Sequence, residues 1–329
     1  MILNRRNFLT HAGTGLAAAA GFGYILPACG PKKGVPDTAT TSGPFFKISL
    51  AQWSLNRSLF GGRITNLDFP GVAKNEFGID AVEYVNQFFA DKAQDADYLR
   101  ELKQRCDDLA VKNVLIMIDL EGYLAEADDA ERMRAVENHY KWVEAAQFLG
   151  CHAIRVNAFA TATGYDAALQ AAVDGLGRLC EFAEPHGINV LVENHGGFSS
   201  NGQWLGEVMR QVNRPNCGTL PDFGNFCLKR SEPTENTLEA WMATVCLEEY
   251  DRYKGMEELM PFAKGVSAKA NNFDSEGNEP DIDFERILRI VKQAGYTGYI
   301  GIEFEGQGDE TEGIIATRDL LIRIGSTLA

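Results

Sequence analysis

The stretch that decides the fold is Asn189-Val190-Leu191-Val192-Glu193-Asn194-His195, a short apolar run that ends abruptly in polar residues. Its apolar residues follow one another without alternation, which is typical of a strand buried on both faces of a parallel sheet. Seven further runs of this kind occur along the chain, at residues 46–51, 81–85, 114–118, 153–156, 217–220, 265–268 and 299–302. The sequence therefore predicts a sheet of parallel strands.

Longer amphipathic segments separate these runs. Their apolar residues recur at three- and four-residue spacing, which predicts helices at 92–110, 128–149, 167–186, 204–212, 284–294 and 309–326. Successive strands begin 28 to 48 residues apart, enough for one strand, one helix and two loops. Eight such units predict an α/β protein with a (β/α)8 TIM barrel. An open doubly wound sheet is the alternative, but no glycine-rich phosphate-binding loop follows the first strand. The longest interval predicts an insertion over the barrel mouth, from Phe223 to Pro261.

The composition limits the classes of partner. The chain of 329 residues is 45% hydrophobic and 23% charged, which allows a large core. Its 31 Lys and Arg against 46 Asp and Glu give a net charge of −15, so the basic stripe of a nucleic-acid-binding protein is not expected. Past residue 30, every apolar run is far shorter than the ~20 residues of a membrane span. We therefore expect no nucleic-acid partner and no transmembrane segment, while the oligomeric state stays open.

The N-terminal residues have the features of an export signal. Arg5-Arg6 precedes a charge-free stretch rich in Ala, Gly and Leu, which ends at Leu26-Pro27-Ala28-Cys29. The arginine pair resembles the twin-arginine signal, and the ending resembles a bacterial lipobox, which would place a lipid on Cys29. We expect an export signal peptide at 1–28, a flexible linker at 29–45 and the barrel at 46–329. The protein would be periplasmic or a membrane-anchored lipoprotein; alternatively, the signal is an ordinary cleaved one and Cys29 is incidental.

Six further cysteines follow Cys29, scattered over about 140 residues without Cys-x-x-Cys spacing. In an oxidising compartment they could pair in 15 ways. A chain of this size does not need crosslinks for stability, so we expect buried free thiols.

Acidic residues follow three of the predicted strands. Glu193 comes directly after the run at 189–192, Asp222 follows the run at 217–220, and Glu303 follows the run at 299–302. In a barrel the carboxyl ends of the strands meet at one face, so the three carboxylates would converge. Because converging carboxylates repel one another, a divalent cation is the commonest way to hold them together. The sequence therefore predicts a metal site at this face.

Four motifs lie near the ends of the last four predicted strands: Val-Glu-Asn-His at 192–195, Pro-Asp-Phe-Gly-Asn at 221–225, Val-Ser-Ala-Lys at 266–269 and Gly-Tyr-Thr-Gly-Tyr-Ile-Gly-Ile-Glu at 295–303. Together they resemble the sugar phosphate isomerase/epimerase family of xylose-isomerase-like TIM barrels. The resemblance implies a divalent metal held by Glu, Asp, His and Glu, of which Glu193, Asp222 and Glu303 match. Ser267 stands where the family has its histidine, and His195, Ser267 or water could replace that ligand. A set of carboxylates with little nitrogen favours Mn²⁺ or Mg²⁺ over Zn²⁺.

The resemblance also implies the chemistry. Glu193 would take a proton from the carbon next to a sugar carbonyl and Glu303 would return one. Lys269 would stabilise the enediolate or form a salt bridge to Glu303 or Asp222. Further candidates for binding the sugar are Glu83, Asn157, His195 and Trp53, besides Gln52 and Asn86.

The predicted function is that of an exported, metal-dependent sugar isomerase or epimerase with a small-molecule sugar substrate. Two alternatives stay open: a related sugar lyase or dehydratase, and a non-catalytic carbohydrate-binding barrel.

Overall fold

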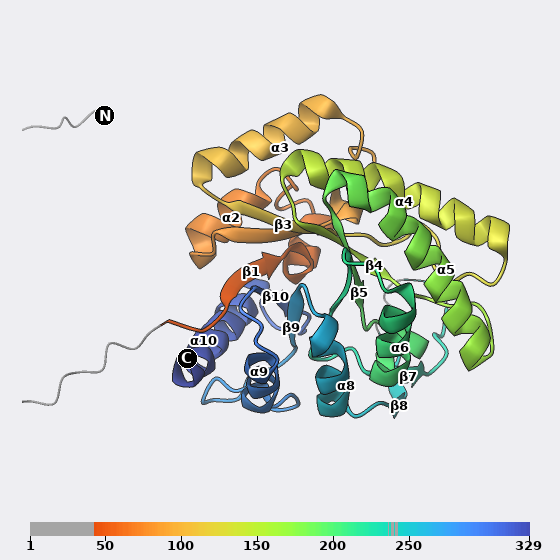
Figure 1. Cartoon of the computed structure of the whole chain (residues 1–329). Coiled ribbons are helices and arrows are strands. Elements are labelled where there is room, and N and C mark those ends of the chain that lie inside the picture. The colour runs from red at the N-terminus through yellow and green to blue at the C-terminus, as the bar shows by residue number, and fades with distance from the viewer. Residues whose placement is uncertain (1–42, 236, 238–239, 241–242) are drawn as a thin grey trace, which may run out of the picture. The chain divides into compact units, whose positions relative to one another are not determined.

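Eight parallel strands form the centre of the molecule (Figure 1). The structure is a computed structural model that describes residues 43–329 apart from 236, 238–239 and 241–242, so the predicted signal peptide and most of the predicted linker lie outside the described residues. The strands are β1 (Lys47–Ala51), β2 (Ala81–Val85), β3 (Lys112–Met117), β4 (Ala153–Asn157), β5 (Asn189–Glu193), β6 (Cys217–Leu220), β9 (Val266–Ala270) and β10 (Tyr299–Phe304).

The strand order closes the sheet into a barrel. Neighbours run β6-β5-β4-β3-β2-β1-β10-β9, and parallel bridges from Thr219 to Ala263 and from Asp222 to Ser267 link the two ends of this series. The predicted (β/α)8 TIM barrel is therefore confirmed. All eight strands lie within two residues of their predicted bounds.

Helices lie between the strands and cover the outside of the barrel (Figure 1). They are α1 (Asn56–Phe60), α2 (Phe69–Phe77), α3 (Ala96–Leu109), α4 (Asp129–Leu149), α5 (Tyr165–Ala183), α6 (Gly202–Val212), α8 (Arg252–Leu259), α9 (Phe284–Gln293) and α10 (Glu310–Leu328). Many begin at an Asp or Asn whose side chain accepts a backbone N–H of the first turn, as at Asp95, Asp128, Asn201, Asp283 and Asp309. None of the helices in the described part of the chain has the length and apolar character that a membrane span requires.

The expected insertion contains a hairpin of β7 (Cys227–Arg230) and β8 (Cys246–Glu249). It follows β6 and contacts the 3-10 turn η4 (Gly197–Ser200) after β5, so it leaves the barrel at the carboxyl ends of these strands. A disulfide joins Cys227 to Cys246, and our expectation of free thiols is wrong for this pair. Because β8 is exposed along its whole length, the hairpin has little core of its own, and a crosslink is an effective way to stabilise it. The other described cysteines, Cys106, Cys151, Cys180 and Cys217, are free as expected.

The inside of the barrel has two layers. One layer is apolar, with Ala81, Ala153, Leu191 and Leu220 in one buried cluster. Two positions further along β4 and β5 lie Arg155 and Glu193, and two positions beyond Leu220 lies Asp222, all buried. Since side chains two apart in a strand point to the same side, these charged groups line the inside at the carboxyl ends.

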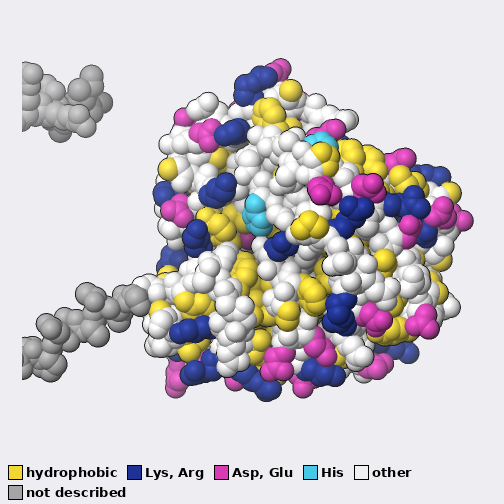
Figure 2. All heavy atoms as spheres, in the orientation of Figure 1, with side chains coloured by type: hydrophobic (Ala, Val, Ile, Leu, Met, Phe, Trp, Pro, Cys, Tyr) yellow, Lys and Arg dark blue, Asp and Glu magenta, His cyan; other side chains and the backbone are white. Residues whose placement is uncertain are grey.

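The face shown in Figure 2 carries acidic and basic side chains interspersed around its rim.

Candidate metal centre and active site

Three carboxylates converge at the carboxyl ends of the strands, as the sequence predicts. Glu193 is the last residue of β5, Asp222 lies two residues beyond β6, and Glu303 is the fifth residue of β10. Each offers an oxygen, and these oxygens all lie within 4.8 Å of one another. None of the three side chains is more than 3% exposed. This group, the carboxylate triad, is the strongest candidate for a site.

Backbone and amide groups hold Asp222 and Glu193 in place. The Asp222 Oδ1 atom accepts the N–H groups of Gly224 and Asn225, at 2.8 and 2.7 Å. The Asn225 side chain donates from Nδ2 to Glu193 Oε1 at 2.9 Å. Asn194 clamps the same turn, because it accepts the Asp222 N–H and donates to the Asp222 carbonyl. The two carboxylates are thus oriented by the loop after β6.

Ser267 fills the place next to Asp222 and Glu303. Its Oγ atom lies 2.6 Å from Asp222 Oδ2 and 2.8 Å from Glu303 Oε2. A hydroxyl donates only one proton, so one of these two carboxyls must itself carry a proton when no cation is present. Burial, reinforced by the charges of Glu193 and Glu303, raises the pKa of Asp222 well above its usual value. Burial also acts to raise the pKa of Glu303, but the charges of Lys269 and Arg155 outweigh it and lower that pKa. Of the two carboxyls, Asp222 therefore holds a proton more readily than Glu303.

Two buried cations flank the triad. The Lys269 Nζ atom lies 3.0 Å from Glu305 Oε1 and 3.7 Å from Glu303 Oε2, which forms the salt bridge to Glu303 considered from the sequence. The Arg155 Nε atom lies 2.8 Å from Glu193 Oε2, and its NH1 atom lies 2.8 Å from Asp119 Oδ1. Burial opposes both charges, but the neighbouring carboxylates raise the pKa of each cation. Both side chains are therefore charged.

Asp119 extends the site toward His195. Asn157 Nδ2 donates to Asp119 Oδ1 at 2.7 Å, and its Oδ1 lies 2.9 Å from His195 Nδ1. Because Asn157 Oδ1 can only accept, the proton of the neutral imidazole is on Nδ1 and Nε2 is free to accept. Burial and the Arg155 charge lower the pKa of His195 to about 4. His195 is neutral, and it is not among the converging groups, whereas the Ser267 hydroxyl contacts both Asp222 and Glu303.

Glu83 lies deeper than the triad. Its Oε1 accepts a hydrogen bond from Ser49 at 2.6 Å, and a Cβ added to Gly301 would lie 2.6 Å from its Oε2. Gly301 precedes Glu303 by two residues, so Glu83 occupies the next layer of the interior. Burial raises the pKa of Glu83 to about 8.

The remaining candidates for sugar binding have different surroundings. Trp53 lies at the mouth, with its ring 6.1 Å from that of Phe88. Gln52 accepts the Val85 N–H and donates to Asn66, while Asn86 donates to the Asp119 carbonyl. Both amides therefore bind neighbouring loops.

The sequence interpretation missed Arg155, Asp119 and Asn225. Arg155 carried a detectable signal, because a charged residue within a predicted buried strand needs a partner. Asn225 is the last residue of the Pro-Asp-Phe-Gly-Asn motif at 221–225, which was a signal, whereas Asp119 gave none beyond its place in a loop after a strand.

The donors present fit a hard divalent cation. Three carboxylate oxygens are directed at one point, and the neighbouring hydroxyl of Ser267 adds a fourth oxygen. Such an all-oxygen set suits Mg²⁺ or Mn²⁺. Together with Asp119 and Glu305, the triad sets five carboxyl groups against two cations, Arg155 and Lys269, and a divalent cation would offset the excess of negative charge.

Comparisons with known proteins agree with this architecture. The family model described as "Xylose isomerase-like TIM barrel" matches residues 73–324. An L-ribulose 3-epimerase structure aligns over 86% of this chain and 95% of its own, with 16% identity and a TM-score of 0.62. The IOLI protein with a bound zinc atom aligns over 86% of this chain and 99% of its own, with 14% identity and a TM-score of 0.64. At these identities the two likenesses support the fold.

A curated relative is similar over a short stretch. The C-glycoside deglycosidase alpha subunit of Arthrobacter globiformis is 43% identical over 49 residues. These residues are 15% of this chain and 14% of that relative.

Proposed function

Because this chain belongs to the xylose isomerase-like TIM barrel family, we propose that it is a metal-dependent sugar isomerase or epimerase that transfers a proton next to a sugar carbonyl. The observation that carries the proposal is the carboxylate triad, buried and directed at one point at the carboxyl ends of the strands. In a TIM barrel this face is where catalytic residues lie.

The triad and Ser267 would hold one Mn²⁺ or Mg²⁺ ion. When bound, such a cation polarises a sugar carbonyl or hydroxyl and makes the adjacent carbon more acidic. Lys269 and Arg155 keep positive charge beside Glu303 and Glu193, which supports negative charge developing on the substrate oxygen.

Glu193 is the better base of the two glutamates. Burial, together with the charge of Glu303, raises its pKa to about 7 even though Arg155 acts in the opposite direction. This pKa applies to the metal-free protein; a bound cation would lower it and keep Glu193 ionised, which is the form that accepts a proton from the substrate. Arg155 and Asn225 fix the two oxygens of this carboxylate, so they are positioning residues for the base. Glu303 would take up a proton from solvent and deliver it from its own side of the centre, while Glu193 releases the abstracted proton to solvent, so that both groups return to their starting states.

The proposal is tested by solvent exchange with two conservative variants. Glu193→Gln and Glu303→Gln keep the shape and one oxygen ligand but remove the proton acceptor. We expect kcat to fall by about 10²- to 10⁴-fold. Incubation of ketoses and 3-keto-glycosides with the Mn²⁺-loaded protein in D₂O should place deuterium next to the carbonyl, and either variant should slow this exchange. Glu285→Gln, on the exposed surface of α9, is the matched control.

Two results would contradict these roles. Full turnover without deuterium incorporation would indicate a hydride shift and remove Glu193 as the base. Loss of exchange in Glu305→Gln, with Glu303→Gln active, would transfer the role of Glu303 to its neighbour.

A second candidate is a lyase that uses the same base and expels a leaving group from the adjacent carbon. The short likeness to the deglycosidase alpha subunit favours it. Product analysis separates the two: an isomerase conserves the substrate mass, whereas a lyase releases water or an aglycone. If titration with Mn²⁺ and Mg²⁺ shows no specific site, the non-catalytic carbohydrate-binding barrel is the better reading.

We also propose that the chain is exported and carries a lipid on Cys29. Arg5-Arg6 and the Leu26–Cys29 ending support the signal, and the disulfide between Cys227 and Cys246 supports an oxidising compartment. Fractionation of the native host should find the protein with membranes outside the cytoplasm, and Cys29→Ser should release it. A pool of this protein in the cytoplasm would contradict the proposal.

A further inference from the structure

One half of the barrel mouth is lined by apolar side chains that the proposed chemistry does not use. They come from the loops after four neighbouring strands, β1 to β4, and comprise Trp53, Phe60, Phe88, Leu120, Tyr123 and Phe159. Three of them are largely exposed: Phe60 by 53%, Leu120 by 88% and Tyr123 by 50%. We call this set the apolar arc.

Ring contacts connect the arc to the candidate site. At one end, the Phe60 and Phe88 ring centroids lie 5.0 Å apart, and Trp53 packs against both. At the other end, Phe159 lies 5.9 Å from the Tyr123 ring and 5.6 Å from the His195 ring. His195 in turn is linked through Asn157 and Asp119 to Arg155 and the triad.

Hydrogen bonds hold the backbone of the segment that carries Trp53 and Phe60. Ser54, next to Trp53, donates to the Ile302 carbonyl and accepts the Phe304 N–H, so it is tied on both sides of Glu303. Buried Glu310 accepts the N–H groups of Arg57 and Ser58 and thereby fixes the start of α1, the helix that ends at Phe60.

The backbone at Leu120 is also held in a fixed conformation. Its φ angle is 62°, a left-handed conformation that a leucine rarely adopts. The preceding residue, Asp119, is held by two hydrogen bonds with Asn86 and by Arg155. The fold therefore fixes an apolar side chain in water, next to the exposed rings of Phe60 and Tyr123 in the loops after strands β1 to β3.

The opposite half of the mouth is lined by polar and charged side chains. Asn225, Lys269 and Glu305 lie there, and each carries groups that can bind sugar hydroxyls.

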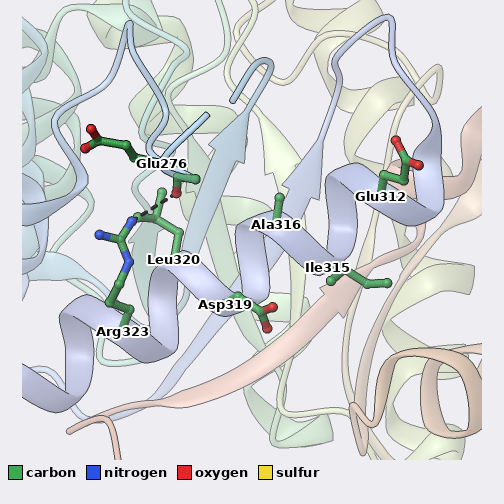
Figure 3. A pocket seen from close by; sticks show the side chains of 8 residues that line it. Glu276, Glu312, Ile315, Ala316, Asp319, Leu320 and Arg323 are labelled. Carbon is green, nitrogen blue, oxygen red and sulfur yellow. Dashed lines mark hydrogen bonds between the residues drawn. The ribbon is translucent and has the colours of Figure 1, made fainter. Parts of the chain in front are cut away.

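A cavity of about 440 Å³ elsewhere, on the outer side of α10, lies outside the barrel (Figure 3). Arg323, which lines it, donates to the Gly277 carbonyl and to Asn278, and nothing there points to a ligand.

We propose that the apolar arc binds an aromatic group attached to the sugar, so that the substrate is an aryl glycoside rather than a free monosaccharide. This deepens the proposed function and rests on it for the identity of the sugar site. The polar half would hold the sugar over the triad, while the arc stacks against the flat apolar substituent. Aromatic rings and a leucine offer a large apolar area and few hydrogen bonds, which suits a flat apolar aryl group. A second sugar ring, whose C–H face can also stack on aromatic side chains, is the alternative that the test includes.

The test is binding, which needs no turnover. Isothermal titration compares 4-nitrophenyl and methyl β-glycosides of glucose, galactose and xylose, and cellobiose as the two-sugar probe. For at least one sugar, we expect the aryl compound to bind about tenfold tighter than its methyl counterpart, because the ring is removed from water. Phe60→Ala and Tyr123→Ala should each weaken aryl binding by about 2- to 10-fold without changing the affinity for the methyl compound.

Phe148→Ala is the matched control, since Phe148 is 42% exposed on α4 and outside the arc. Equal affinity for aryl and methyl compounds of every sugar, no aryl binding at millimolar concentrations, or cellobiose binding tighter than the aryl compounds would overturn the proposal. So would an aryl preference that survives the double variant Phe60→Ala/Tyr123→Ala.

Its failure is distinguishable from failure of the proposed function. The titrations are run with EDTA and with Mn²⁺, and the aryl preference is measured whether or not solvent exchange occurs. An arc that binds aryl groups in a protein without exchange activity would contradict only the proposed reaction. Exchange activity without aryl preference would contradict only the role of the arc.

Discussion

The two layers inside the barrel are built from the same strands but have opposite effects on the stability of the fold. Leu191 and Leu220 lie in the apolar layer, and two positions later β5 reaches Glu193 and the loop after β6 reaches Asp222. Burying leucine side chains stabilises the fold by about 1.5–3 kcal/mol each. Burying charges costs several kcal/mol per ion before partners compensate. The comparison indicates that stability is concentrated in the apolar layer, which allows the other layer to hold charged groups.

Compensation in the charged layer is visible group by group. Arg155 forms ion pairs with Glu193 and Asp119, and Lys269 forms ion pairs with Glu303 and Glu305. The Ser267 hydroxyl lies within hydrogen-bond distance of Asp222 and Glu303. In the apolar layer, by contrast, close packing of the side chains is the interaction that stabilises the fold. Substitutions in the two layers should therefore change different properties.

The largest effect is expected in the charged layer, on metal binding. Asp222→Ala should abolish specific binding of Mn²⁺ and with it the activity, because one of three converging carboxylates is lost. The free energy of unfolding should fall by only about 1–3 kcal/mol, since two backbone N–H groups lose their acceptor. Elemental analysis, calorimetry and urea unfolding measure the three quantities.

Two further variants separate these effects. Asp222→Asn keeps an acceptor for the turn, so it should lose the metal with less loss of stability. Asp97→Ala, whose native carboxylate is 92% exposed, is the control and should bind metal normally. Equal metal content in wild type and Asp222→Ala would break the assignment of the charged layer.

The apolar layer should respond in the opposite way. Leu191→Ala removes a fully buried side chain and should lower the free energy of unfolding by about 2–5 kcal/mol. Metal affinity should stay within a few-fold of wild type in the fraction that is folded. Leu247→Ala on β8, where the leucine is 61% exposed, is the control and should have little effect on unfolding. A Leu191→Ala protein of native stability without metal binding would show that the layers are not separate.

The smallest expected effect is a change in how steeply the free energy of unfolding varies with pH. Burial raises the pKa of Glu83 to about 8 from an ordinary 4.5. Between these values the folded protein keeps a proton that the unfolded chain has released, so the free energy of unfolding falls as pH rises from 4.5 to 8. Glu83→Gln cannot titrate, and urea unfolding of the metal-free variant should show a shallower decline over this range.

Glu193 also has a raised pKa, so part of the decline should persist in the Glu83→Gln variant. Identical slopes for wild type and variant would mean that Glu83 is ionised in the folded protein.

Much of the barrel was predictable because its pattern is local. Runs of consecutive apolar residues gave the eight strands, and their polar ends gave Glu193, Asp222 and Glu303. Glu305, two residues after Glu303, would point to the same side as Glu303 if the strand continued. The structure separates them because β10 ends at Phe304, so Glu305 turns to Lys269 at the rim.

What the sequence did not predict depends on contacts between distant segments. Asp119 belongs to the site only because Arg155 and Asn157 of β4 reach it from the neighbouring strand. The disulfide has no spacing signature, since it forms where a hairpin brings Cys227 beside Cys246. Helix α2 was overlooked because Pro70 and Gly71 interrupt its sequence, although proline is well tolerated in a first helical turn.

The closed base of the hairpin bears on how this barrel can diversify. The Tyr250 N–H donates to the Phe226 carbonyl and the Ser231 N–H donates to the Val245 carbonyl, on either side of the disulfide. The two ends of the insertion are therefore joined before α8 begins, whatever sequence lies between Ser231 and Val245. Selection can alter the length of that segment without moving Glu193 or Asp222. For protein engineering, the same feature makes the segment a grafting point, where we expect an added peptide to be presented beside the mouth while the barrel keeps its geometry.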